Sequence, residues 1–275
     1  MRRTRLPRSD PSNWLPAAAR ALLRGAALVW LRARFGSGSG AERPVFILGH
    51  MRSGSSLLLH LLISSPEILG YGERNSAYAS LTDFRRMAVD IHYHRRRLLR
   101  RSRYLIDQIN HDRFIESDDL LCHPDLRILL LVREPEASIA SMVDVLGRHY
   151  GTTLEDSTDY YVARLATLAR YARQIDDPGR CRCLTYGELI DDTEQTLSGL
   201  VRFLGLEHGL SDRYRVLPFT GRHGDPSERI RSGRIIRDAP PRAIALEPLV
   251  RERLSRAYAD CRATLESHCG LLRPT

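Results

Sequence analysis

The sequence predicts an α/β protein with a three-layer α/β/α fold, in which a central, mostly parallel sheet carries a P-loop-like phosphate-binding loop. Short, wholly apolar runs such as Val45–Leu48 and Ile128–Val132 are typical of strands that a parallel sheet buries on both faces. Between Val45–Leu48 and a second apolar run, Leu57–Leu62, lies a segment rich in glycine and serine. With 275 residues, 43% of them apolar, the chain is long enough for one large domain with a full core.

The first 40 residues differ from the rest of the chain. Residues 14–35 read as a basic helix, and residues 36–40 (G-S-G-S-G) as a flexible linker. The longest uncharged run of the helix, residues 25–31, is far shorter than the roughly 20 residues that span a bilayer. We therefore expect residues 1–40 to be a basic helix and linker, packed on the domain or in contact with a membrane surface, and residues 41–275 to be one domain.

The segment Gly49–Ser56 has the features of a phosphate-binding loop. It joins a buried strand to a helix, and the first backbone N–H groups of a helix are unpaired and favour an anion. Gly54 lets the backbone come close to a ligand. Hydroxyl donors are available from Ser53, Ser55 and Ser56.

One position in this loop argues against an ATP-dependent enzyme. The spacing from Gly49 to Ser56 fits the G-x-x-x-x-G-K-[ST] frame, but Ser55 stands where the lysine that reaches the β- and γ-phosphates belongs. The chain contains no lysine at all, so its 42 basic residues are all arginine. The positive charge of the loop is Arg52.

Candidates for a general base follow the next two predicted strands. Ile68–Tyr71 is expected to be a short strand with Glu73 just after it, and Tyr104–Asp107 a strand followed by His111. The carboxyl ends of strands are where doubly wound sheets bind ligands. A carboxylate or an imidazole at that edge can accept the proton of an attacking group.

A second anion site is predicted after Ile128–Val132. Arg133 emerges at the carboxyl end of this strand, Pro135 suits a first helical turn, and Ser141 lies eight residues after the arginine. A guanidinium and a hydroxyl so placed can converge on one phosphate.

The remaining segments alternate between helix and strand as an α/β fold requires. The expected elements are a mostly helical stretch 76–103, a helix 156–175, a strand 181–185, a helical stretch that begins at Tyr186 and closes at 203–206, a basic loop 224–234 and a closing helix 243–268.

Together these motifs resemble the sulfotransferase family. The loop R-S-G-S-S resembles its 5′-phosphosulfate loop, and V-R-E-P with a serine eight residues after the arginine resembles its 3′-phosphate motif. The resemblance implies 3′-phosphoadenosine 5′-phosphosulfate (PAPS) as donor and no metal. It further implies that Arg52–Ser56 binds the phosphosulfate, that Arg133 and Ser141 bind the 3′-phosphate, and that Tyr186 lies beside the adenine. Arg231, Ser232 and Gly233 match, with serine for lysine, a loop that covers the 3′-phosphate.

The resemblance leaves two bases open. Glu73, 21 residues after Arg52, resembles the glutamate of the branch that modifies tyrosine in proteins, which the R-S-G form of the loop also favours. His111, 22 residues before Arg133, resembles the histidine of the cytosolic small-molecule branch, but the lysine that accompanies that histidine is missing here. We therefore prefer Glu73, and we expect Arg52 to carry more of the charge on the leaving phosphate.

Acceptor and location are less well defined by the sequence. A net charge of +9 suits an anionic partner, although no motif indicates nucleic-acid binding. We expect a small-molecule, carbohydrate or peptide acceptor, and a cytoplasmic protein whose five cysteines are free thiols. A catalytically silent nucleotide-binding module and, less favoured, a P-loop kinase are the alternatives. The arginines at 95–97, 100 and 101 are either a solvated helix face or an anion-attracting rim.

Overall fold

A six-stranded parallel sheet forms the centre of the molecule. The computed structural model describes residues 42–95, 102–225, 227–237 and 244–272, together with residues 25, 26 and 29. The strands are β1 (Arg43–Gly49), β2 (Ile68–Gly70), β3 (Tyr104–Ile109), β4 (Arg127–Val132), β5 (Cys181–Thr185) and β6 (Gly270–Leu271). Their order is β2-β3-β1-β4-β5-β6, and all neighbouring pairs are parallel. The predicted α/β fold with a mostly parallel sheet is confirmed.

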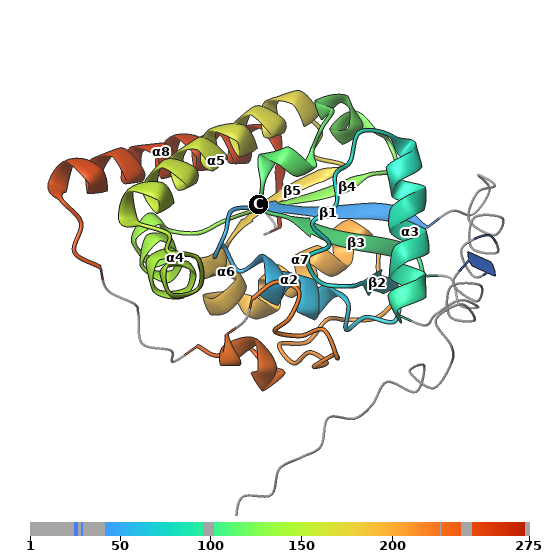
Figure 1. The fold of residues 1–275 in the computed structure, drawn as a ribbon. Helices are drawn as coiled ribbons and strands as arrows, with labels where there is room; N and C mark the ends of the chain where they lie inside the picture. The colour runs from blue at the N-terminus through green and yellow to red at the C-terminus, as the bar shows by residue number, and fades with distance from the viewer. Residues whose placement is uncertain are drawn as a thin grey trace, which may run out of the picture.

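Helices cover both faces of the sheet (Figure 1). They are α2 (Ser55–Leu62), α3 (Leu81–Arg95), α4 (Pro135–Tyr150), α5 (Leu154–Ile175), α6 (Tyr186–Asp191), α7 (Thr193–Leu204) and α8 (Pro248–His268). Short 3-10 turns lie at Asp112–Phe114 (η2), Asp118–Cys122 (η3) and Glu228–Ser232 (η4). Helices α3, α4, α5 and α8 pack on one face, and α2, α6 and α7 on the other.

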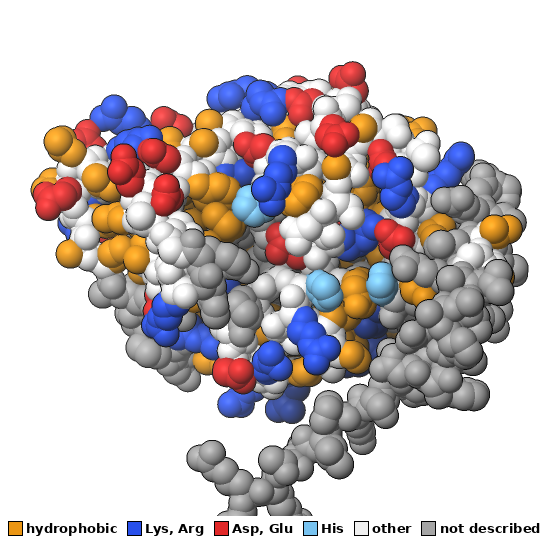
Figure 2. Space-filling model, in the orientation of Figure 1, with side chains coloured by type: hydrophobic (Ala, Val, Ile, Leu, Met, Phe, Trp, Pro, Cys, Tyr) orange, Lys and Arg blue, Asp and Glu red, His pale blue; other side chains and the backbone are white. Residues whose placement is uncertain are grey.

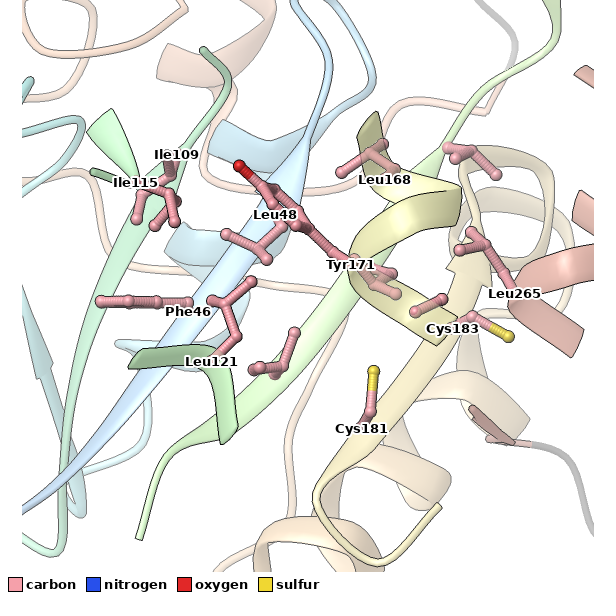
Figure 3. Close-up of a cluster of buried hydrophobic side chains, with 14 of the residues drawn as sticks. Phe46, Leu48, Ile109, Ile115, Leu121, Leu168, Tyr171, Cys181, Cys183 and Leu265 are labelled. Atoms are coloured by element: carbon pink, nitrogen blue, oxygen red, sulfur yellow. The ribbon is translucent and has the colours of Figure 1, made fainter. Parts of the chain in front are cut away.

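The central residues of β1 and β4 are all apolar because alternate residues enter two different cores. Phe46 and Leu48 of β1 belong to the cluster with α5 and α8, whereas Val45 and Ile47 belong to the cluster with α2 and α7. Figure 3 shows the first cluster, in which side chains of β1, β5, α5 and α8 meet. Complete burial of such a side chain contributes about 1.5 to 3 kcal/mol to stability, which explains why the alternation of polar and apolar residues is missing.

The candidate site lies where the strand order reverses. Strand β1 pairs with β3 on one side and with β4 on the other. Because the sheet is parallel, the segments that follow β1, β3 and β4 all leave at the same edge. Such a switch point opens a crevice at the carboxyl ends of the strands.

Arg164 of α5 closes the ends of two of these strands. Its side chain is only 1% exposed, and it donates from Nε to the Gly49 carbonyl at 2.8 Å and from Nη2 to the Ile109 carbonyl at 2.8 Å. Its third nitrogen, Nη1, pairs with Asp112. One buried guanidinium therefore fixes where β1 and β3 end, a role that no local pattern in the sequence indicates.

Several element boundaries differ from those expected. Strand β3 runs two residues further, to Ile109, so that Gln108 lies within the strand rather than after it. Of the predicted helical stretch 76–103, α3 covers Leu81–Arg95; residues 76–80 and 102–103 are not helical, and residues 96–101 lie outside the described ranges. The stretch from Tyr186 divides into α6 and α7, the predicted basic loop contains η4, α8 starts at Pro248, and β6 was not predicted.

Some predictions fall outside the described residues. The helix over 14–35 is described only at residues 25, 26 and 29, which are helical, and the linker 36–40 and the arginines after Arg95 are not described. The division at residue 40 therefore stays a prediction. Within the described ranges, no helix is long and apolar enough to cross a membrane. The five cysteines are free thiols, as predicted.

Candidate active site

The loop between β1 and α2 has the backbone of an anion-binding turn. Two residues of the loop have left-handed backbone conformations, Arg52 (φ 66°) and Gly54 (φ 97°). The Ser53 amide, between them, donates to the His50 carbonyl at 3.1 Å. A Cβ on Gly54 would lie 2.5 Å from a ring carbon of Tyr186. Glycine is thus required at this position both by the backbone angle and by the tyrosine that lies against it.

The amino end of α2 is suited to a phosphate. Gly54 is its N-cap, no side chain in the described parts of the chain caps the helix, and its first turn has no acidic residue. The first amides of the helix therefore keep their hydrogen-bonding capacity, and the helix dipole adds a positive potential. These features fit the phosphosulfate of the donor that the resemblance implies. Ser53 Oγ, by contrast, is buried beneath the loop against Gly49.

His50 joins this loop to the end of β4. It is fully buried, its Nδ1 donates to the Met51 carbonyl at 2.9 Å, and its Nε2 accepts from the Arg133 amide at 3.1 Å. Burial is the main reason why the pKa of His50 falls to about 4, and Arg164 and Arg133 nearby lower it further. The neutral imidazole thereby holds the two predicted phosphate-binding segments together.

This histidine makes stability depend on pH. An unfolded His50 binds a proton near pH 6.5 and the folded one only near pH 4, so the unfolded state binds more protons between these values and stability falls as the pH falls through that window. We expect wild-type protein to lose about 2 to 3 kcal/mol of unfolding free energy from pH 7 to pH 4 relative to His50→Gln. Urea titrations at several pH values measure this difference. Parallel pH curves for the two proteins would contradict it.

Arg52, Arg133, Ser141 and Tyr186 meet in one cluster. Arg133 donates to the Arg52 carbonyl at 3.2 Å, and its guanidinium carbon lies 4.1 Å from the centre of the Tyr186 ring. Arg52 in turn donates from Nε to Ser141 Oγ at 2.9 Å. The two predicted motifs are therefore adjacent, and Arg52 is the residue that links them.

A carboxylate that the sequence analysis missed also contacts Arg52. Asp225 accepts from Arg52 Nη1 at 2.9 Å, and its amide donates to Ser56 Oγ at 3.0 Å. Burial raises the pKa of Asp225, but Arg52 and the hydrogen bonds from Ser227 outweigh it and lower the pKa below its usual value. Asp225 is therefore ionised at neutral pH, inside the predicted donor site.

Glu73 lies near the phosphate loop, since Gln108 Nε2 is 3.2 Å from Ser56 Oγ and 3.5 Å from the Glu73 carboxylate. Its carboxylate accepts from Asn110 Nδ2 at 3.2 Å and more weakly from Gln108 Nε2 at 3.5 Å. Burial raises the pKa of Glu73, although both amides and Arg113 oppose this. The pKa of His111 is lowered, first by burial and then by Arg113. The environment thus favours the neutral form of both predicted bases. The raised pKa makes the Glu73 carboxylate a stronger base, and the lowered pKa keeps the His111 imidazole uncharged.

A buried network fixes the backbone next to Glu73. The Arg74 amide donates to Asp107 Oδ1 at 3.3 Å, the Tyr78 hydroxyl donates to Asp107 Oδ2 at 2.6 Å, and Arg74 Nη1 donates to the Tyr78 hydroxyl at 2.6 Å. Arg74 also pairs with Asp90 of α3 at 2.6 Å. These bonds tie the segment after β2 to β3 and α3, so the position of Glu73 is set by tertiary contacts.

These groups line one cavity of about 790 Å³. Of the predicted site residues, the lining includes Arg52, Gly54, Ser55, Ser56, Glu73, His111, Arg133, Ser141 and Tyr186. Figure 2 shows arginine side chains gathered on the lower part of this face, over the segment that follows α7. Arg229 and Arg234 of that segment line the cavity, whereas Arg231 is directed to Glu228 and toward Gly221. Neither Ser232 nor Gly233 contributes to the lining.

The comparisons with known proteins agree with this geometry. The model of the sulfotransferase family matches residues 117–210, a range that contains Arg133, Ser141 and Tyr186. This match supports the predicted sulfotransferase family. No curated protein matches the sequence.

Two solved sulfotransferase domains have the same fold. The domain from the curacin biosynthetic pathway is 15% identical with a TM-score of 0.51, and 79% of this chain and 98% of that chain are covered. The domain from the Synechococcus PCC 7002 olefin synthase is 19% identical with a TM-score of 0.53, covering 79% and 95%. The family match does not reach Arg52 or Glu73, so the branch of the family that this chain resembles more closely stays a prediction.

Proposed function

We propose that this sulfotransferase transfers a sulfuryl group from PAPS to a hydroxyl or amine group of an acceptor. The observation that carries the proposal is the junction of two anion-binding segments, in which Arg52 bonds to Ser141 and Arg133 bonds to the Arg52 backbone. A nucleotide with charged groups at both its 3′ and 5′ positions requires two such sites side by side. ATP, with phosphates only at the 5′ position, does not.

Each part of the donor has residues that suit it. The amino end of α2 and Arg52 suit the 5′-phosphosulfate, Arg133 and Ser141 suit the 3′-phosphate, and Tyr186 suits the adenine. We also propose, from the resemblance to the family, that Arg231, Ser232 and Gly233 form the loop over the 3′-phosphate. The cavity arginines Arg229 and Arg234, from the same segment, supply charge for the same phosphate.

In the reaction, Glu73 accepts the proton of the acceptor hydroxyl as that oxygen bonds to sulfur. The bond between sulfur and the bridging oxygen of the 5′-phosphate breaks, and its electron pair stays on that oxygen. Arg52 and the amides of α2 stabilise the charge that grows there. Alignment and charge neutralisation are what the chain supplies.

The acceptor side of the cavity is lined by Glu73, Asn75, Asn110 and His111. It suits a small molecule, a carbohydrate or a peptide that presents one hydroxyl or amine group. Contact with a membrane surface through residues 14–35 and a cytoplasmic location remain predictions. The location is supported by the free state of all five thiols.

Calorimetry with 3′-phosphoadenosine 5′-phosphate (PAP) and with ATP plus Mg²⁺ tests the donor. We expect PAP to bind and ATP to bind at least tenfold more weakly, about 1.4 kcal/mol. Preferential binding of ATP with Mg²⁺ would favour the kinase. Binding of PAP by a protein that transfers no sulfuryl group to any pool of alcohols, phenols, sugars or peptides would favour the silent module.

Arg133→Ala tests the 3′-phosphate site. The substitution should weaken PAP binding by about 2 to 4 kcal/mol, the range for removing one partner of a buried charged pair. Binding of adenosine 5′-phosphosulfate, which lacks the 3′-phosphate, should hardly change. Arg127→Ala, at the opposite end of the same strand, is the matched control. Equal losses for both nucleotides would remove the assignment.

A further inference from the structure

We propose that Asp225 is a specificity-determining residue for the donor: its carboxylate competes with the 5′-phosphosulfate for Arg52, so that only a ligand with a strong anion at the 5′ position displaces it. This inference rests on the proposed function and adds to it a residue that resemblance to the family did not assign. The segment that carries Asp225 lies between α7 and η4.

The segment lies directly on the phosphate loop. Asp225 Oδ1 is 2.9 Å from Arg52 Nη1, and the Asp225 amide donates to Ser56 Oγ at 3.0 Å. The preceding residue is equally close, since a Cβ on Gly224 would lie 2.6 Å from Ser56 Oγ. Two of the polar groups proposed to bind the phosphosulfate, the Arg52 guanidinium and the Ser56 hydroxyl, are thus both hydrogen-bonded to Asp225.

Hydrogen bonds from Ser227 hold the Asp225 carboxylate in this position. Ser227 donates to it twice, from its amide to Oδ1 at 3.0 Å and from Oγ to Oδ2 at 2.9 Å. The Asp225 side chain is 23% exposed and that of Arg52 is 14% exposed, so the pair is largely shielded from water. Among the described residues, Asp225 is the only carboxylate within salt-bridge distance of Arg52. A phosphosulfate at the amino end of α2 must therefore exchange with it.

The same segment reaches the proposed base. The Glu73 amide donates to the His223 carbonyl at 3.4 Å, and a Cβ on Gly72 would lie 2.6 Å from that carbonyl. Gly224, between the contacts to Glu73 and to Ser56, has φ 115°, which only glycine adopts readily. The segment that carries Asp225 therefore contacts both the phosphate loop and the backbone of Glu73.

The competition gives a prediction about affinity. If Asp225 occupies Arg52 in most molecules, the apparent affinity for PAP is reduced in proportion to the fraction of molecules in which Arg52 is available. Asp225→Asn keeps the size of the side chain and removes its charge. It should tighten PAP binding about tenfold, because the ligand no longer has to break the charge-assisted contact between Arg52 and Asp225. Binding of adenosine 3′-monophosphate, whose phosphate belongs at Arg133, should not change.

Calorimetry on the full chain tests this with three controls. Asp159→Asn removes an exposed carboxylate that pairs with Arg253, and neither residue lines the cavity. In an Arg52→Gln background, Asp225→Asn should no longer tighten PAP binding. Asp225→Ala should act as Asp225→Asn does, and thermal unfolding of each variant verifies that it is folded.

The outcomes separate this inference from the proposed function. Equal PAP affinity of wild type and Asp225→Asn, weaker binding by the variant, or an equal gain for PAP and adenosine 3′-monophosphate would overturn the inference alone. If neither protein binds PAP, the donor assignment and the inference both fail.

Discussion

Glu73→Gln is expected to lower the turnover number by at least about a hundredfold while leaving PAP binding intact. A positioned general base contributes about 10²- to 10⁴-fold, and glutamine keeps the shape of the side chain but cannot accept the proton. The carboxylate that is lost is held by Asn110 and Gln108 at the edge of the cavity. Initial rates at saturating donor, with calorimetry of PAP, measure the two effects separately.

The pH dependence of the rate identifies the base independently. Burial raises the pKa of Glu73 above the usual value of a glutamate, so the rate should rise with pH along a limb that is shifted in the same direction and that Glu73→Gln removes. Glu116→Gln, at an exposed position just after η2, is the matched control. If His111→Ala abolishes transfer and Glu73→Gln does not, the roles are reversed and His111 is the base.

Arg164→Met is expected to lower the unfolding free energy by about 3 to 5 kcal/mol, the range for breaking a buried charged network. Methionine fills much of the volume but donates to neither the Gly49 nor the Ile109 carbonyl, so two buried acceptors lose their partner. Urea titration monitored by circular dichroism measures the change.

Arg170→Met is the matched control for this substitution. Arg170 lies on the same helix, but it is 52% exposed and pairs with Asp118 at the surface, so its loss should cost less than about 1 kcal/mol. A loss for Arg164→Met no larger than that of the control would show that the strand ends are stable without the buried guanidinium. A folded Arg164→Met protein should also bind PAP more weakly, because the loop after Gly49 loses its anchor.

The sequence by itself determined the sheet and the position of the phosphate loop. Both follow from local physics. Val45–Leu48 is apolar on both faces, so it can only be buried between two layers. The loop after this strand leads through Gly54 into a helix, whose first backbone amides have no partner within the helix. Arg133 and Ser141 were also predictable because a strand end and the next two helical turns are close in the chain. The break between α6 and α7 was not evident, because the capping box of Thr185 and Glu188 marks the start of α6 and not the break at Asp192.

Only the tertiary structure brought together residues that are far apart in sequence. Arg164 reaches Gly49 across 115 positions and Asp225 reaches Arg52 across 173. His50 contacts Arg133 across 83. No local pattern distinguishes one arginine among 42, or a lone histidine, from its neighbours. What selects these three is the cost of an unpaired buried charge or carbonyl, which exists only once the chain is folded and water has left.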